Sequence, residues 1–276
     1  MKSKQLDTAT IEQFKKTIWH YFHTQGRTFS WRKTTDPYLI VVSEIMLQQT
    51  QTFRVEPKFE NFTAHFPTFQ TLATAPFSEV LRCWKGLGYN RRALALQKIA
   101  QEVVHNYNGI LPNDPEILDS FPGIGPATAA SICAFAFNKP TIFIETNIRA
   151  VFIHFFFQNQ TKITDAQIYP LVAQTVDEHN PRNWYYALMD YGVLLKKMYP
   201  NPSRKSAHHT KQSTFEGSNR QIRGLILQAL LEQASCTFEQ LCCAINRDKN
   251  KIAEMLNELI KDKLIEYHDP FFKLSS

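Results

Sequence analysis

The sequence has no apolar run of about 18 residues, the length that a membrane-spanning helix requires. Residues 1–7 also lack the apolar stretch of a secretory signal, so we expect a protein of the cytoplasm or nucleoid with no membrane partner. Cysteine is scarce, and its spacing fits neither a disulfide framework nor a metal site; the residues are Cys83, Cys133, Cys236, Cys242 and Cys243. We therefore predict reduced thiols and no metal ligand set.

Acidic residues are absent from one stretch and nearly absent from another. The formal net charge is +6 and the isoelectric point is about 9.0. Residues 80–98 carry basic side chains and no acidic one, and residues 201–223 carry basic side chains against Glu216 alone. Clustering of positive charges is more typical of a protein that binds a polyanion than of a generic soluble surface.

Strand-like alternation is also rare, because apolar residues recur at helical spacing along most of the chain. We predict an all-α fold. The expected helices are 11–24, 36–50, 55–66, 77–83, 91–106, 115–120, 126–137, 147–157, 166–176, 183–197, 220–232, 237–246 and 248–261. Residues 264–274 are expected to form a terminal hairpin, and three helices followed by a hairpin resemble a winged-helix module.

A polar segment divides the chain. Residues 201–218 are rich in Ser, Thr, Lys and His and have few apolar residues, which is typical of an exposed connection. We therefore predict a large domain over residues 1–200, a basic linker over 201–218 and a winged-helix-like domain over 219–276.

The segment from Leu118 to Ala130 combines an apolar approach, a glycine turn and a small-residue helix start. Gly123 and Gly125 allow close approach of the backbone to a ligand, and Pro126 suits the first turn of a helix. Unpaired N–H groups at such a helix start attract a phosphate. A Gly-x-Gly pair alone is more often an ordinary turn between helices, but the surrounding pattern favours DNA. Contacts of this kind set register on a duplex and read no sequence.

Two glutamates are candidates for catalysis. Glu44 falls on the apolar face of the helix expected from Asp36, and a single glutamate there usually lies at the edge with its carboxyl group in solvent. If Glu44 is buried, burial raises its carboxyl pKa and prepares proton donation near neutral pH. Glu145 follows an apolar run and stands where a helix begins, so capping alone also explains it. Hydrolysis of a glycosidic bond needs an acid for the leaving group and an anion for the developing cation.

Together, four motifs resemble the adenine DNA glycosylases of the MutY type, within the helix-hairpin-helix glycosylase superfamily. They are Ser43–Gln51, Gly86–Tyr89, the hairpin at residues 121–130 and Met189–Gly192. The resemblance spans about residues 14–200 and implies a glycosylase core of two helical subdomains. It also implies double-stranded DNA with a mispaired or damaged base as the partner, with the target base flipped out of the duplex.

The resemblance assigns roles position by position. Glu44 matches the glutamate that protonates adenine, and Glu145 stands where the family has an aspartate that stabilises the sugar cation. Gln48 matches a glutamine that wedges into the base stack, and Tyr89 a tyrosine that intercalates beside the partner base. Further DNA contacts are implied for Gln49, Arg91, Gly123, Gly125, Ala127 and Asn147.

Ala127 predicts the class of reaction. Relatives such as endonuclease III that also cleave the strand carry a lysine nucleophile at this hairpin position, whereas alanine has none. We therefore predict a monofunctional hydrolase that leaves an abasic site.

The chain departs from the family in three respects. Glu145 has one more methylene than the aspartate, a displacement of about 1.5 Å that is large enough to alter rate or substrate. The four cysteines that hold an iron–sulfur cluster in the family are absent, so no cofactor is expected, although the superfamily allows a monovalent cation at the hairpin. The tail from Arg220 is too short for the Nudix-like domain that checks for 8-oxoguanine.

The leading hypothesis is removal of adenine opposite 8-oxoguanine or guanine by a monomeric enzyme of base excision repair. One alternative keeps the fold and changes the base to thymine or uracil opposite guanine, or to a deaminated purine. Another is a non-catalytic DNA-binding protein on the same scaffold.

Overall fold

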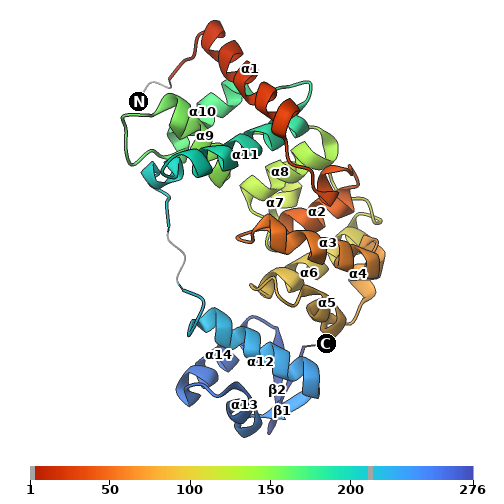
Figure 1. The fold of residues 1–276 in the computed structure, drawn as a ribbon. Helices are drawn as coiled ribbons and strands as arrows, with labels where there is room; N and C mark the ends of the chain where they lie inside the picture. Colours follow the sequence, from red (N-terminus) through yellow and green to blue (C-terminus); the bar gives the residue numbers. More distant parts are fainter. Residues whose placement is uncertain (1–3, 211–213, 276) are drawn as a thin grey trace. The chain divides into compact units, whose positions relative to one another are not determined.

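The computed structural model describes residues 4–210 and 214–275 and is mostly helical, with one small sheet (Figure 1). Lys211 of the predicted basic linker and the start of the chain at residues 1–3 lie outside the described residues. The chain folds into two compact units, each made of two sequence segments. The first unit is Met1–Glu44 with Pro112–Lys211, and the second is Ile45–Leu111 with Gln212–Ser276.

The first unit is built around three mutually packed helices. In Figure 1, α11 (Pro181–Met198) runs between α1 (Thr8–Gln25) and α9 (Thr146–Phe156) and contacts both. The other elements are η1 (Ser30–Arg32), most of α2 (Pro37–Leu47), α7 (Pro115–Asp119), α8 (Pro126–Phe137), α10 (Asp165–Thr175) and η2 (Pro202–Lys205). Phe14 packs edge-on against the fully buried Trp184 at a centroid distance of 5.9 Å, and aromatic pairs of this geometry rigidify a core.

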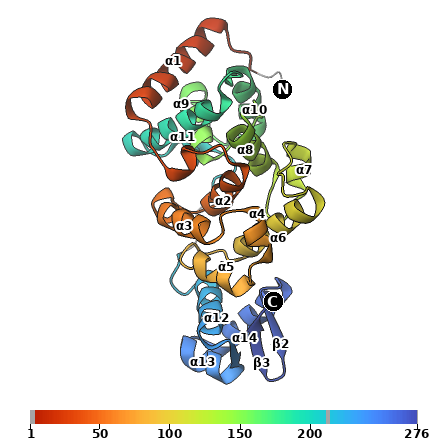
Figure 2. The same ribbon diagram turned by 90° about the vertical axis from the view of Figure 1, so that its right-hand side faces the viewer.

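The second unit joins a helical segment to a winged-helix domain. The helical segment contains α3 (Thr52–His65), α4 (Phe69–Thr74), α5 (Phe77–Trp84) and α6 (Arg91–Asn106). The winged-helix part contains α12 (Asn219–Gln233), β1 (Ser235–Thr237), α13 (Phe238–Ile245), α14 (Lys249–Lys261), β2 (Ile265–His268) and β3 (Phe271–Leu274). Its sheet is antiparallel in the order β1-β3-β2, and Figure 2 shows the β2–β3 hairpin beside α14.

The predicted helices and terminal hairpin are confirmed, and the ends differ by a few residues. Four short elements were not predicted from the sequence: η1, η2, α4 and β1. Helix α4 has only six residues, too few for a periodic pattern, and begins with a capping box between Thr68 and Thr71. Strand β1 is three residues long and completes the sheet by pairing with β3.

The helix predicted over residues 36–50 starts as expected but ends earlier. Asp36 caps it by accepting from the N–H of Tyr38 at 2.8 Å. The helix stops at Leu47, and Gln49 has a left-handed φ of 53°. Gln48, Gln49 and Thr50 therefore lie on a loop, a correction to the predicted helix. The reason is Arg92, whose guanidinium hydrogen-bonds the carbonyls of Ile45, Met46 and Gln48.

Residues 202–207 pack against the first unit, whereas the sequence predicts an exposed connection from residue 201. Pro202 and Ser203 are buried, and the Ser203 hydroxyl donates to the Thr146 carbonyl at 3.1 Å. Ile163 and Ser206 form an isolated parallel β-bridge. Polar hydrogen bonds thus fix a segment that has too few apolar residues to signal packing.

Candidate active site

Glu44 lies on α2 among apolar residues. Its neighbours Val42 and Ile45 are fully buried, and the side chain of Glu44 is itself half-buried. Desolvation raises the pKa of Glu44 to about 7, Ser131 opposes that rise, and the charge of Glu145 adds to it. A carboxyl group with this pKa is half protonated at neutral pH and suits general acid catalysis.

The Ser131 hydroxyl links Glu44 to the hairpin helix α8. Ser131 Oγ lies 2.5 Å from Glu44 Oε2 and 2.9 Å from the Thr128 carbonyl oxygen. A hydroxyl has one proton to donate, so it serves one of these acceptors at a time. When Glu44 is ionised, Ser131 donates to the carboxylate. When Glu44 is protonated, the acid donates to Ser131, and Ser131 donates to Thr128. The pair therefore accommodates both protonation states of Glu44.

Glu145 is the N-cap of α9, and three hydrogen bonds hold its carboxyl group in place. Its Oε1 accepts from the backbone N–H groups of Asn147 at 2.7 Å and Ile148 at 2.9 Å. Its Oε2 accepts from the Asn147 side-chain amide at 3.1 Å. These donors and the positive end of the helix dipole stabilise a fixed negative charge. The interpretation of Glu145 as a helix cap is confirmed. The same hydrogen bonds hold its carboxyl group in a fixed position.

Asn147 is also held from α11. The Lys196 ammonium donates to Asn147 Oδ1 at 2.7 Å, and burial lowers the Lys196 pKa while Glu145 opposes that shift. A Cβ added at Gly192 would lie 2.5 Å from the Asn147 carbonyl oxygen. Only glycine therefore permits this crossing of α11 and α9 beside Glu145.

The Met189–Gly192 motif supplies a structural ion cluster. Asp190 is buried and accepts from Arg27 Nε at 2.7 Å and from both terminal nitrogens of Arg32, at 2.8 and 2.9 Å. The Arg32 guanidinium also lies 4.4 Å from the centroid of the Tyr186 ring. Desolvation, followed by the charge of Glu44, raises the pKa of Tyr186 to about 12, so this phenol stays neutral beside the carboxyl group.

The predicted hairpin joins α7 to α8. Leu118, Phe121 and Ile124 are buried, as the sequence predicts, and Gly123 has a left-handed φ of 78°. No described side chain caps the start of α8. A Cβ added at Gly125 would meet no described heavy atom within 4 Å, so the space over its backbone is open. Ala127 is exposed on the first turn of α8.

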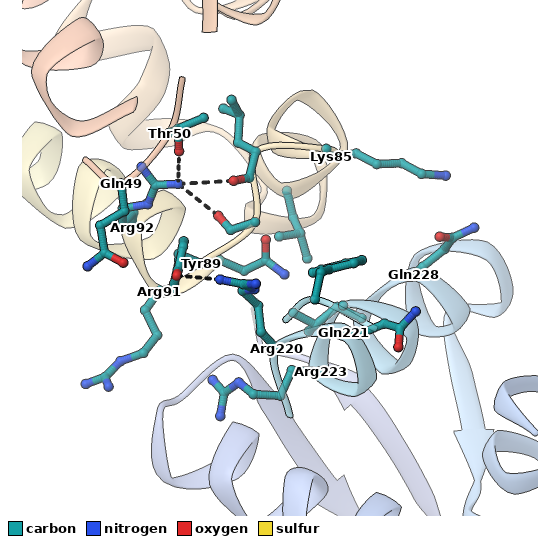
Figure 3. Close-up of a pocket in the computed structure, with 18 of the residues that line it drawn as sticks. Gln49, Thr50, Lys85, Tyr89, Arg91, Arg92, Arg220, Gln221, Arg223 and Gln228 are labelled. Atoms are coloured by element: carbon teal, nitrogen blue, oxygen red, sulfur yellow. Dashed lines mark hydrogen bonds between the residues drawn. The ribbon is translucent and has the colours of Figure 1, made fainter. Parts of the chain in front are cut away.

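Three of the other predicted DNA contacts lie on two loops of the second unit, whereas Arg91 begins α6 and Asn147 lies on α9 of the first unit. Gln48 and Gln49 follow α2, and Tyr89, with a left-handed φ of 48°, precedes α6. Arg92 ties the loops together by donating to Thr50 Oγ1 and to the Leu87 and Gly88 carbonyls as well as to α2 (Figure 3). Left-handed backbone at two non-glycine positions costs free energy and is typical of functional sites.

Sequence reasoning missed several residues of this arrangement. Neither Ser131 nor Arg92 is singled out in the sequence analysis. Tyr186 and Lys196 carried no motif. Each of these residues contacts a segment far away in the sequence, so no local pattern reveals its role. The one local indication was the position of Arg92 directly after the Gly86–Tyr89 motif.

Among the described residues, no group of three or more His, Cys, Asp and Glu side chains is placed to hold a metal ion. No described helix is both long and apolar enough to cross a membrane.

A family model for the HhH-GPD superfamily of base excision DNA repair proteins matches residues 42–174. Residues 42–174 therefore belong to this helix-hairpin-helix superfamily. It is 36% identical over 187 residues to the adenine DNA glycosylase of Buchnera aphidicola subsp. Baizongia pistaciae, an alignment that covers 66% of this chain and 52% of that enzyme. The chain therefore spans about half the length of that relative.

A second relative is covered more fully. The chain is 28% identical to the thymine/uracil-DNA glycosylase of Methanothermobacter thermautotrophicus, over 69% of this chain and 89% of that enzyme. Among solved structures, a thermostable thymine-DNA glycosylase matches with a TM-score of 0.61 and 27% identity, over 67% of this chain and 87% of the other. A trapped endonuclease III–DNA covalent intermediate matches with a TM-score of 0.57 and 17% identity, over 68% of this chain and 86% of the other, which shows the fold alone.

Proposed function

We propose that the chain is a monofunctional DNA glycosylase that hydrolyses the N-glycosidic bond of adenine mispaired with 8-oxoguanine or guanine. The observation that carries the proposal is the pair of coupled carboxyl groups. Glu44 has its pKa raised to about 7 in an apolar setting, and Glu145 is fixed as an anion at the start of α9. Divergent environments for two carboxyl groups give them different roles.

In the proposed reaction, the Glu44 acid donates its proton to the adenine ring, which then leaves with the electron pair of the C–N bond. Glu145 stabilises the resulting sugar cation through its charge. Water adds its oxygen to C1′, and its proton returns to the Glu44 carboxylate. The sum is hydrolysis to free adenine and an abasic site, without a cofactor.

The absence of strand cleavage follows from Ala127. An alanine side chain supplies no amine to attack C1′, so no covalent intermediate with the sugar forms. We expect borohydride to trap no complex with substrate DNA, whereas Ala127→Lys gains a trapped product. A trapped complex of the wild-type protein would contradict the monofunctional assignment.

The hairpin and the loops supply the DNA contacts in this proposal. Gly123, Gly125 and the N–H groups at the start of α8 approach a backbone phosphate, together with Ala127. Gln48, Gln49, Tyr89, Arg91 and Asn147 contact the lesion or its strand. The partner is duplex DNA, and we expect a monomer that acts at the nucleoid.

The choice of adenine is supported by the adenine DNA glycosylases among the relatives, at 36% identity for the Buchnera enzyme. The thymine/uracil-specific relative, covered over 89% of its length, supports thymine or uracil opposite guanine as a second candidate.

Single-turnover excision on duplexes that differ only in the mismatch separates the two. We expect adenine release opposite 8-oxoguanine or guanine and none of thymine or uracil. Release of thymine or uracil instead would establish the second candidate, and salt-dependent binding with no excision on any duplex would favour a DNA-binding protein.

A further inference from the structure

A large groove in the second unit separates α12 from the two loops of the helical segment (Figure 3). It has a volume of about 1560 Å³. Gln48, Gln49 and Tyr89 line one side, and Phe215 and Arg220 line the other. The winged-helix domain therefore forms a wall of the same groove as three residues predicted to contact DNA.

Arg220 is the central contact across this groove. Its Nη1 donates to the Tyr89 hydroxyl at 2.7 Å, as the dashed line in Figure 3 shows. Its guanidinium carbon lies 5.3 Å from the ring centroid of Tyr89 and 5.3 Å from that of Phe215. Both distances are those of cation–π contacts, and the Tyr89 and Phe215 rings give the groove flat, π-bearing surfaces.

Two other arginines that line the groove are paired with carboxylates. Arg223 pairs with Glu258 at 3.0 Å and with Asp262 at 2.5 Å, and Arg91 lies 3.5 Å from Asp262. No described carboxylate pairs with Arg220. Its guanidinium has five N–H donors and no acceptor, and only one donor is used on Tyr89, so it is suited to a ligand that presents acceptors.

Three further basic residues of the winged-helix domain lie outside the groove lining, whereas Lys261 belongs to it. Arg247 pairs with Glu216 at 2.8 Å, and Lys249 and Lys251 are exposed on α14. Of the two winged-helix arginines that line the groove, Arg220 is the one with no carboxylate partner among the described residues.

We propose that this groove receives the base opposite the excised nucleotide and that Arg220 is a specificity-determining residue for it. The proposal rests on the proposed function. The preferred base is a guanine-type purine, meaning guanine or 8-oxoguanine. Arginine pairs best with the O6 and N7 acceptors of guanine, and the broad purine ring stacks on Tyr89 and on the Phe215 ring, which is 56% exposed.

Binding to uncleavable DNA tests this proposal separately from excision. The probe is a duplex with a tetrahydrofuran abasic analogue opposite guanine, 8-oxoguanine, cytosine or thymine, and the readout is Kd at fixed salt. We expect the wild type to prefer the two purines by about tenfold over the pyrimidines. Arg220→Ala should reduce that preference to about twofold or less, because the donor pair is lost.

Two variants control for charge and folding. Arg220→Lys keeps the positive charge but loses the planar fork, so it should bind all duplexes without the purine preference. Lys251→Ala removes a charge outside the groove and should keep the preference. Thermal melting checks that each variant is folded.

Wild-type binding without a purine preference, or an undiminished preference in the folded Arg220→Ala or Arg220→Lys variant, would overturn the proposal. Failure of the wild type to release adenine from any mismatch would instead overturn the proposed function. The binding measurement does not depend on that reaction.

Discussion

Glu44 shows how a single ionisable side chain acquires its chemistry from its neighbours. Burial raises its pKa, the nearby Glu145 charge raises it further, and the Ser131 hydroxyl lowers it. The acid is therefore protonated below about pH 7 and ionised above it. Glu145, with three donors on its carboxylate, is suited to the opposite role. The apolar pattern places Glu44 on an apolar helix face but leaves its burial open, and the hydroxyl from α8 could not be predicted.

The Ser131→Ala substitution tests this balance. Removing the hydroxyl takes away a donor to the ionised carboxylate, so the pKa of Glu44 should rise. Because the reaction needs the protonated acid, the loss of activity at alkaline pH should move to higher pH. Single-turnover excision measured from about pH 5.5 to 9.5 gives the midpoint. A midpoint that is unchanged or lower than in the wild type would show that Ser131 does not tune Glu44.

Two features act at the level of secondary-structure elements. Helix α2 ends at Leu47 because the Arg92 guanidinium donates hydrogen bonds to its last carbonyl groups. The same guanidinium donates to the Gly88 carbonyl and so holds the loop before α6. Helices α9 and α11 cross closely where Gly192 faces the Asn147 backbone. Both arrangements position predicted site residues.

Arg92→Met should destabilise the protein strongly. The substitution leaves several buried carbonyl groups without their donor, and we expect the free energy of unfolding to fall by about 3 kcal/mol or more. Arg91→Met is the matched control, because the Arg91 side chain is 73% exposed and its ion pair should contribute less than about 1 kcal/mol. Urea denaturation measures both. Equal effects of the two substitutions would contradict the role of Arg92.

Gly192→Ala should displace the start of α9. The added Cβ would lie 2.5 Å from the Asn147 carbonyl oxygen, so the helices must separate, at a cost of about 1–3 kcal/mol. Gly224→Ala in α12 is the control: a Cβ there meets no described heavy atom within 4 Å, and the better helix propensity should stabilise by about 0.5–1 kcal/mol. Thermal melting compares the two, and similar shifts in Tm would refute the packing argument.

For the molecule as a whole, the sequence predicts most helices, the hairpin and the winged-helix domain. Periodic apolar residues and capping residues carry that information locally. Less predictable features depend on long-range contacts, such as the packing of Ser203 on Thr146 and the approach of Arg220 to Tyr89. The polar residues 202–207 gave no signal that they would be buried, and α4 lacks the Asp-Pro start that marks the even shorter α7.

The central claim is that Glu44 is the general acid of an adenine-excising reaction. Single-turnover excision of adenine opposite guanine, by the wild type and by Glu44→Gln across the same pH range, tests it most directly. The wild-type rate should fall as pH rises through about 7, following ionisation of Glu44. The Glu44→Gln rate should be lower by about 100-fold or more and lack that pH dependence. A folded Glu44→Gln protein that excises adenine at the wild-type rate would contradict the claim.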